Sequence, residues 1–162
     1  PYLGGILHAI EVPALGGETR FANMCRVYRS LPEATRVRLA GLTALSVYDY
    51  AATDRATKVR DATAPRAVHP VVRVHEESGE EALFVCRLMT ERILELAEDE
   101  SAALLEELFA HIERSPDFYE HSWRVADTVI WDNRCVTHAR NDFDPGERRF
   151  LKRVTVVAAG MS

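Results

Sequence analysis

The sequence predicts a mainly β fold with inserted helices (α+β), of the antiparallel β-sandwich or jelly-roll type. Two observations lead to this prediction: short apolar runs recur at close spacing along the chain, and two stretches of helical periodicity are inserted between them. The runs do not alternate with helices in the regular order of βαβ units, which argues against a parallel sheet.

The first half of the chain is expected to hold three strands and one helical region. The strands are the short apolar runs at residues 2–12, 18–22 and 42–50. Gly4 and Gly5 lie inside the first run and indicate a β-bulge there. Residues 24–42 have the period of a helix. The mixed-charge stretch 51–66 has no clear period, and we interpret it as a long loop, either a lid or a disordered insert.

The second half is expected to hold a hairpin, a long helix and four closing strands. Residues 70–75 and 82–85 flank a turn at residues 77–79 and so predict the hairpin. Residues 90–96 are interpreted as a short helical turn. Residues 99–112 are apolar on one side and acidic on the other, as in an amphipathic helix. The closing strands are expected at residues 118–124, 128–131, 135–139 and 149–158.

Composition narrows the classes of function. A chain of 162 residues is expected to form one domain, residues 1–162, with a sizeable core. The net charge of −5 gives no support to nucleic-acid binding, and no apolar run approaches the ~20 residues of a membrane span. The three cysteines lie far apart, which favours a reducing, cytoplasmic location. A homo-oligomer is compatible with the sequence, which does not indicate one.

The most informative stretch runs from Trp131 through His138 to three arginines. The imidazole of His138 follows a short apolar strand, and Arg149 and Arg153 lie on the next strand-like run. Their even offset places both on one face of a strand, whereas Arg148 points to the other face. An imidazole suits a metal and a guanidinium suits a carboxylate, so the combination is typical of a site for a metal-bound acid.

Each of these residues also has an ordinary structural interpretation. By spacing alone, His138 is more often a buried strand histidine with a satisfied hydrogen bond. Arg149 is as readily one half of a surface ion pair. Trp131 is expected to fill the core, and Asp132 and Asn133 are expected to fix a turn through bonds to the backbone.

Three segments, in the same order along the chain, resemble the taurine dioxygenase (TauD/TfdA) family. They are residues 12–24 with Gly16-Gly17-Glu18-Thr19, the hairpin of residues 69–73 and 82–85, and Trp131-Asp132-Asn133-Arg134 through His138 to Arg149 and Arg153. The family consists of Fe(II)- and 2-oxoglutarate-dependent dioxygenases on a double-stranded β-helix, which is a jelly roll. The resemblance therefore implies Fe(II), O2 and 2-oxoglutarate as cosubstrate. It also implies hydroxylation of a small, anionic organic substrate with release of succinate and CO2.

The same resemblance implies a role for four residues. His138 matches an iron ligand of the family. Arg149 and Thr19 match the pair that binds the far carboxylate of 2-oxoglutarate, although an isolated strand threonine is usually structural. Arg153 matches the arginine that holds the sulfonate of taurine, and we carry it over as a substrate-binding residue for an anionic group, with the substrate left open.

The family's first metal motif, His-x-Asp, does not occur between Pro1 and His138. The resemblance implies that these two iron ligands precede Pro1. We therefore expect the chain to be the C-terminal part of the catalytic domain, with a jelly roll incomplete at its N-terminus, and to be inactive by itself. A degenerate relative without a metal site is the alternative.

Two rival functions stay open at this point. A non-catalytic jelly-roll module would bind a small organic acid through the two arginines without depending on iron. A cupin-type metal isomerase or hydrolase would need further His or Glu ligands on neighbouring strands, and none is well placed in the sequence.

Overall fold

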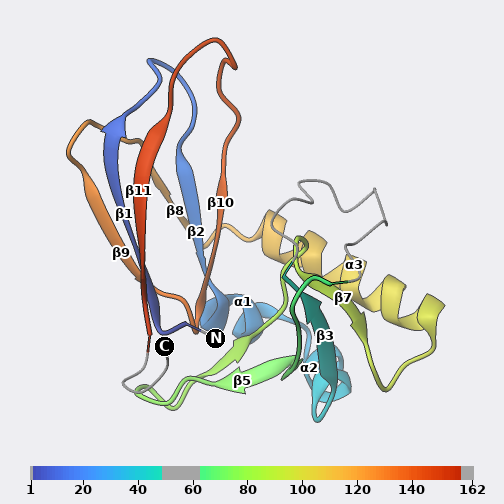
Figure 1. Cartoon of the computed structure of the whole chain (residues 1–162). Coiled ribbons are helices and arrows are strands. Elements are labelled where there is room, and N and C mark those ends of the chain that lie inside the picture. Colours follow the sequence, from blue (N-terminus) through green and yellow to red (C-terminus); the bar gives the residue numbers. More distant parts are fainter. Residues whose placement is uncertain (1, 49–62, 158–162) are drawn as a thin grey trace. The chain divides into compact units, whose positions relative to one another are not determined.

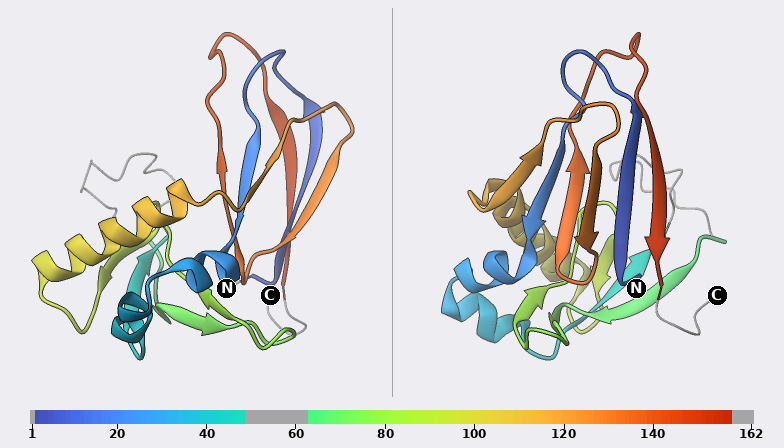
Figure 2. Two further views of the ribbon diagram at one scale, coloured as in Figure 1. Left: turned by 180° about the vertical axis from the view of Figure 1, so that it is seen from behind. Right: turned by 90° about the vertical axis from the view of Figure 1, so that its left-hand side faces the viewer.

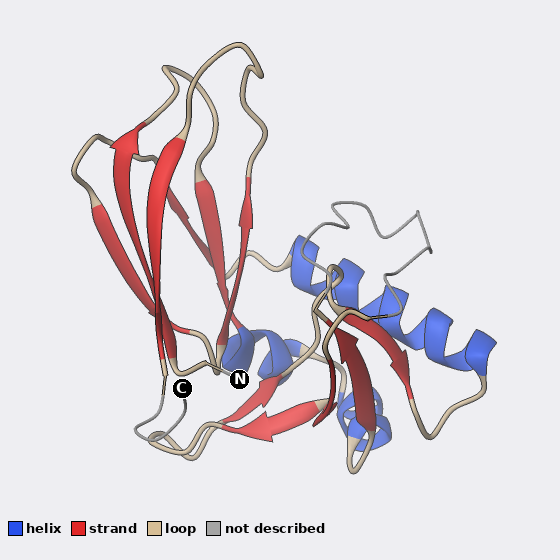
Figure 3. Cartoon of the chain, in the orientation of Figure 1, coloured by secondary structure: helices blue, strands red, loops and turns tan. Residues whose placement is uncertain are grey.

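A computed structural model of the chain describes residues 2–48 and 63–157, in two compact units. Unit 1 comprises Pro1–Asn23 and Pro116–Ser162, and unit 2 comprises Met24–Ser115. The described part of unit 1 is built of strands and loops, whereas the three helices of the described residues all lie in unit 2 (Figure 3). Most of the predicted loop at residues 51–66 lies outside the described residues. The expectation of a single catalytic domain stays a prediction.

Unit 1 contains two three-stranded antiparallel sheets (Figure 1). Sheet β11-β1-β9 is formed by Phe150–Val156, Gly4–Glu11 and Thr128–Asp132, and sheet β10-β2-β8 by Val136–Arg140, Thr19–Asn23 and Phe118–His121. The sheets face each other, because the rings of Phe21 in β2 and Trp131 in β9 lie 5.4 Å apart. This is the predicted sandwich, and the mainly β, jelly-roll fold class is confirmed.

The pairing of β1 with β9 explains one glycine and corrects one prediction. Gly5 pairs with Trp131, and a Cβ at Gly5 would lie within 2.2 Å of a carbon of the indole ring. Gly5 therefore makes room for the tryptophan. The predicted bulge at Gly4 and Gly5 is wrong, since both are in regular register. The irregularity in the pairing of β1 with β11 falls instead between Ala9 and Glu11.

Unit 2 combines helices with two small antiparallel sheets (Figure 2). Its elements are α1 Met24–Ser30, α2 Glu33–Leu39, β3 Thr43–Val47, β4 Arg66–Pro70, β5 Val72–Val74, β6 Glu81–Leu83, β7 Thr90–Ile93 and α3 Glu98–Arg114. Strands pair in the orders β4-β3-β7 and β5-β6. The buried face of α3 carries Leu104, Leu105, Leu108 and Phe109. Among the described helices, none has the length and apolar character needed to cross a lipid bilayer.

Several local predictions for unit 2 can be scored. The long amphipathic helix and the β5–β6 hairpin are confirmed. The single helical region is divided into two helices at Pro32, which precedes α2. The helical turn predicted at residues 90–96 is wrong, because Thr90–Ile93 is a strand paired with β3. Its backbone is fixed by this long-range pairing, which overrides a weak local preference.

Candidate functional site

The inner face of sheet β10-β2-β8 carries the centre of the site. In β2, Thr19 and Phe21 point to the same side, and both are buried. Their partners lie in β10: Phe21 pairs with His138, and Thr19 pairs with Arg140. Directly opposite residues of neighbouring strands share a face, so these four side chains lie on one face of the sheet, with Arg140 at its exposed end.

Arg149, the residue directly before β11, reaches this surface. Its Nε donates a hydrogen bond to the carbonyl oxygen of Gly17 at 2.9 Å, and its Nη2 donates one to Thr19 Oγ1 at 3.3 Å. Thr19 is only 2% exposed. The structure thus brings together two residues that lie 130 positions apart in the sequence and that the family motif pairs.

The turn formed by Gly16 and Gly17 before β2 leaves room for the Arg149 side chain. Gly17 has φ +71°, a left-handed conformation that favours glycine. A Cβ at this position would also come within 3.0 Å of Arg149 Cδ. Any larger residue would both strain the turn and displace the guanidinium from its carbonyl partner.

Arg149 is a half-buried cation that has no acidic partner among the described residues. Burial, followed by the positive charge of Arg140, lowers the pKa of Arg149. No carboxylate of residues 2–48 or 63–157 forms an ion pair with it. A guanidinium that is desolvated and uncompensated favours binding of an external anion.

His138 lies between two aromatic rings on the same inner surface. Its ring centroid is 5.9 Å from that of Phe21 and 4.7 Å from that of Trp131. Burial, followed by the positive charge of Arg153, lowers the pKa of His138 from 6.5 to about 4. The imidazole is therefore neutral near pH 7, the form in which histidine binds a metal.

Arg153 approaches the site from the opposite sheet. It pairs with Leu7 in β1, which places it on the same face as Gly5 and Trp131. Its guanidinium carbon lies 6.0 Å from the centre of the Trp131 ring, at the outer limit of a cation–π contact. Arg148, as expected from its position on the other face, is largely exposed and pairs with Glu11.

The four predicted site residues therefore lie within one unit, in two connected groups. Arg149 and Thr19 form a direct contact, and His138 contacts Trp131, which Arg153 approaches. Phe21, two residues from Thr19 in β2, stacks against His138 and so links the groups.

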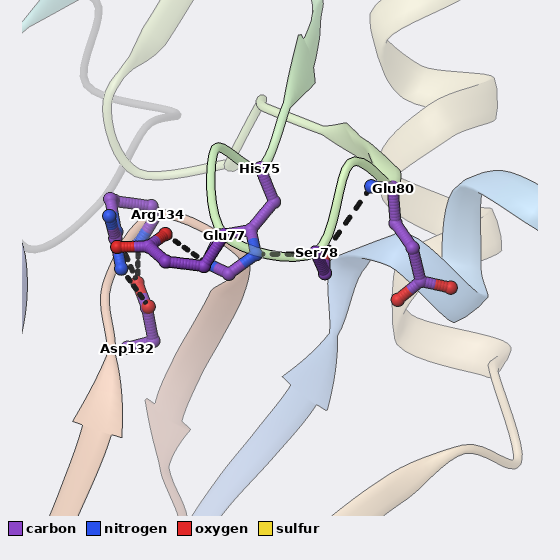
Figure 4. A network of polar contacts seen from close by, with 6 residues as sticks. All are labelled: His75, Glu77, Ser78, Glu80, Asp132 and Arg134. Carbon is purple, nitrogen blue, oxygen red and sulfur yellow. Dashed lines mark hydrogen bonds and ion pairs between the residues drawn. The ribbon is translucent and has the colours of Figure 1, made fainter.

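The turn between β9 and β10 is fixed through Asp132, as the sequence predicts, whereas the Asn133 side chain instead accepts a hydrogen bond from the indole N–H of Trp131 at 3.4 Å. Asp132 Oδ1 accepts hydrogen bonds from the backbone N–H of Arg134 at 2.8 Å and from its Nε at 2.9 Å (Figure 4). This Asx-type arrangement returns the chain so that His138 enters β10 facing inward. Trp131 is 7% exposed and fills the interior as expected, while also contacting His138.

The spacing His-x-Glu, a variant of the family's first metal motif, occurs twice in unit 2 and was overlooked in the sequence. His75 is hydrogen-bonded to Ser78 Oγ at 2.9 Å and lies 3.3 Å from Glu77 (Figure 4). In the second pair, His111 is hydrogen-bonded to Ser30, and Glu113 pairs with Arg87. Residues of both pairs form hydrogen bonds or ion pairs within unit 2, and we assign no metal role to either pair.

Sequence reasoning also missed the aromatic side chains around Thr19. Trp123, in the loop after β8, donates its indole N–H to Thr19 Oγ1 at 2.9 Å. His121, the partner of Thr19 in β8, contacts the Trp123 ring edge-on at 4.5 Å between ring centroids. The alternation of Tyr119, His121 and Trp123 was the available signal, since residues two apart share a side.

Comparison with known proteins identifies the family. The family model for the taurine catabolism dioxygenase TauD, TfdA family matches residues 1–155. The chain belongs to this family. Pentalenolactone F synthase from Streptomyces arenae is 33% identical over 168 residues, which cover 94% of the chain and 56% of that protein.

Two further relatives show the same partial coverage. The alpha-ketoglutarate-dependent 2,4-dichlorophenoxyacetate dioxygenase of Burkholderia sp. (strain RASC) is 36% identical, over 94% of the chain and 52% of its own length. The crystal structure of a taurine dioxygenase from Burkholderia xenovorans superposes with a TM-score of 0.84 at 30% identity. That superposition covers 97% of the chain and 52% of that protein. The chain thus spans about half the length of these relatives.

Proposed function

We propose that the whole protein is an Fe(II)- and 2-oxoglutarate-dependent dioxygenase that hydroxylates a small organic anion. The observation that carries this proposal is the half-buried guanidinium of Arg149, hydrogen-bonded to Thr19 and Gly17 and without a carboxylate partner among the described residues. Such a group lowers its energy by pairing with a carboxylate brought by a ligand.

The far carboxylate of 2-oxoglutarate is the ligand group that we assign to Arg149 and Thr19. The planar guanidinium offers fixed donors that suit a carboxylate, a geometry that lysine cannot reproduce. Thr19 adds a hydroxyl in a place almost free of water, where a hydrogen bond to a charged group is strongest. The name of the similar dioxygenase from Burkholderia sp. (strain RASC) includes the same acid, written as alpha-ketoglutarate.

The imidazole of His138 suits the role of one iron ligand. Its ring is neutral near pH 7, and no described residue hydrogen-bonds its nitrogens. The described part of unit 1 does not by itself supply a cluster of three metal-binding side chains. The remaining two ligands therefore belong, in our proposal, to a part of the protein that the relatives have and these 162 residues do not match. When bound, Fe(II) in such proteins activates O2 and couples decarboxylation of 2-oxoglutarate to hydroxylation.

Arg153 is the group that we assign to the substrate. It lies beside Trp131 and His138, and it retains solvent exposure that allows an incoming anion to reach it. Relatives are named for 2,4-dichlorophenoxyacetate and taurine, a carboxylate and a sulfonate, and both offer an anionic group to an arginine.

We also propose a cytoplasmic location for the protein. The odd number and wide spacing of the cysteines support this location, which cell fractionation can check.

The test uses the complete reading frame that contains residues 1–162. We expect Fe(II)-dependent formation of succinate from 2-oxoglutarate, stimulated by an organic anion substrate. The main rival, a non-catalytic module, predicts 2-oxoglutarate binding that is indifferent to Fe(II), with no succinate formed. That outcome, together with a reading frame lacking His-x-Asp upstream, would reject the dioxygenase proposal.

Matched variants then separate the two arginines. Arg149→Ala should weaken 2-oxoglutarate binding by about 100-fold, the loss of a charge-assisted pair, whereas the adjacent Arg148→Ala should leave it unchanged. Arg153→Ala should raise the KM for substrate and spare 2-oxoglutarate, with Lys152→Ala as its control on the other face of β11. Equal effects of Arg149→Ala and Arg153→Ala on both ligands would contradict this division of roles.

A further inference from the structure

Trp123 holds a position that no part of the family motif explains. It follows the last residue of β8 by two positions and is half-buried, and its indole Nε1 points at a side chain 104 positions away. That side chain is Thr19, whose oxygen lies 2.9 Å from the indole nitrogen.

The hydroxyl of Thr19 has a limited set of hydrogen-bonding options. It offers two lone pairs and one O–H donor, whereas an indole N–H and a guanidinium can only donate. Trp123 and Arg149 both donate to Thr19 Oγ1, at 2.9 and 3.3 Å. With both acceptor sites in use, the O–H of Thr19 is the one part of the group left to form a bond. No described residue accepts a hydrogen bond from this hydroxyl, which belongs to a side chain that is 2% exposed.

We propose that Trp123 is a positioning residue that fixes Thr19 as a hydrogen-bond donor toward the far carboxylate of 2-oxoglutarate. This inference rests on the proposed function. Without the indole N–H, the Thr19 hydroxyl is free to rotate and to share its hydrogen among several directions. With the indole N–H in place, the hydrogen of the Thr19 hydroxyl is directed away from the two donating groups of Trp123 and Arg149. It then points to the space beside Arg149 in which we place the far carboxylate.

Trp123 is itself held in place by a second set of contacts. His121 packs edge-on against the indole, with an interplanar angle of 80°. The His121 ring is hydrogen-bonded to Tyr119 Oη at 2.9 Å and to Asp127 Oδ2 at 3.1 Å. A chain of contacts from Asp127 through His121 and Trp123 thus ends at the Thr19 hydroxyl, as expected of a preorganised ligand site.

The test compares two keto acids that share the metal-binding end. 2-Oxoglutarate carries the far carboxylate, whereas 2-oxopentanoate has the same carbon chain without it. Affinities are measured by calorimetry on the complete protein, with Mn(II) replacing Fe(II) to prevent turnover. Trp123→Phe keeps an aromatic ring and removes the donor, so it should weaken 2-oxoglutarate about tenfold and leave 2-oxopentanoate unchanged. Arg124→Ala, an exposed neighbour, should change neither affinity.

A second variant shows whether Trp123 acts through Thr19. In a Thr19→Val background the hydroxyl is absent, so Trp123→Phe should weaken 2-oxoglutarate no further. Equal weakening of both keto acids by Trp123→Phe, or full additivity with Thr19→Val, would overturn the inference. Wild-type protein that binds 2-oxoglutarate while Trp123→Phe has no effect rejects the inference alone. Wild-type protein that binds no 2-oxoglutarate rejects the proposed function as well.

Discussion

The two units bury different kinds of residue. Most of the buried apolar side chains belong to unit 2. Among the described residues of unit 1, only four apolar side chains are buried: Ala9, Phe21, Ala22 and Trp131. The interior of unit 1 instead presents Thr19, His138 and the guanidinium of Arg149. Polar and cationic groups on the inner faces of a sandwich suit the ligand site that we propose, whereas unit 2 has the aliphatic core of an ordinary folded unit.

Strand β11 shows the same contrast within seven residues. Its inner face carries Leu151, Arg153 and Thr155, and its outer face carries exposed apolar groups: Phe150, Val154 and Val156. A half-buried antiparallel strand ordinarily places apolar residues inward and polar residues outward. The reversal at Arg153 is what a ligand site requires and what a packed core would exclude.

The largest expected effect on stability lies in the core of unit 2. Leu108 is 0% exposed in α3, so Leu108→Ala should lower the free energy of unfolding by about 3 kcal/mol. Leu151→Ala, on the half-buried inner face of β11, should cost about 1 kcal/mol, because less apolar surface leaves water there. Urea unfolding of both variants measures the difference, and equal losses would refute the contrast between the units.

The second prediction concerns pH and the neutral imidazole of His138. Its pKa is about 4 in the folded chain and near 6.5 when unfolded, where the ring is exposed. Above pH 6.5 the ring is neutral in both states, and its contribution to stability is fully present. As the pH falls toward 4, the unfolded chain takes up the proton first, so stability is lost across this window. For the metal-free protein the loss is about 3 kcal/mol, at ~1.4 kcal/mol for each pKa unit.

Two variants isolate this contribution from that of the carboxylates. His138→Gln should flatten the pH dependence between 6.5 and 4 relative to the wild type. Arg153→Ala should shift the lower limit of the window upward, because the positive charge of Arg153 helps to lower the pKa of His138. Urea unfolding at half-unit pH steps provides the data, and an unchanged slope in His138→Gln would show that the ring does not titrate as described.

The sequence was informative where the signal is local or belongs to the family motif. The helix of residues 99–112 was predicted because its apolar residues recur with helical period, and α3 spans Glu98–Arg114. Thr19 and Arg149 were paired from the motif, and the structure places them 3.3 Å apart. Their roles in binding 2-oxoglutarate, and that of His138 toward iron, stay predictions.

What the sequence did not predict depends on contacts between distant residues. Gly5 was interpreted as part of a bulge, although its reason is the Trp131 ring, 126 positions further along the chain. Thr90–Ile93 has little strand character of its own and becomes β7 by pairing with β3. Trp123 belongs to no motif, because the function that we propose for it depends on a hydrogen bond to Thr19, 104 positions away in the sequence.

The smallest expected effect is on the outer face of β11. Val154 is 58% exposed, and Val154→Thr keeps the β-branched shape that suits a strand. Stability should therefore change by less than about 0.5 kcal/mol, and 2-oxoglutarate affinity should not change. The neighbouring Arg153→Ala, one position away but facing inward, should impair substrate use. If Val154→Thr instead reduced substrate use as much as Arg153→Ala, the two faces of β11 would not be functionally distinct, and assigning the ligand site to the interior of unit 1 would fail.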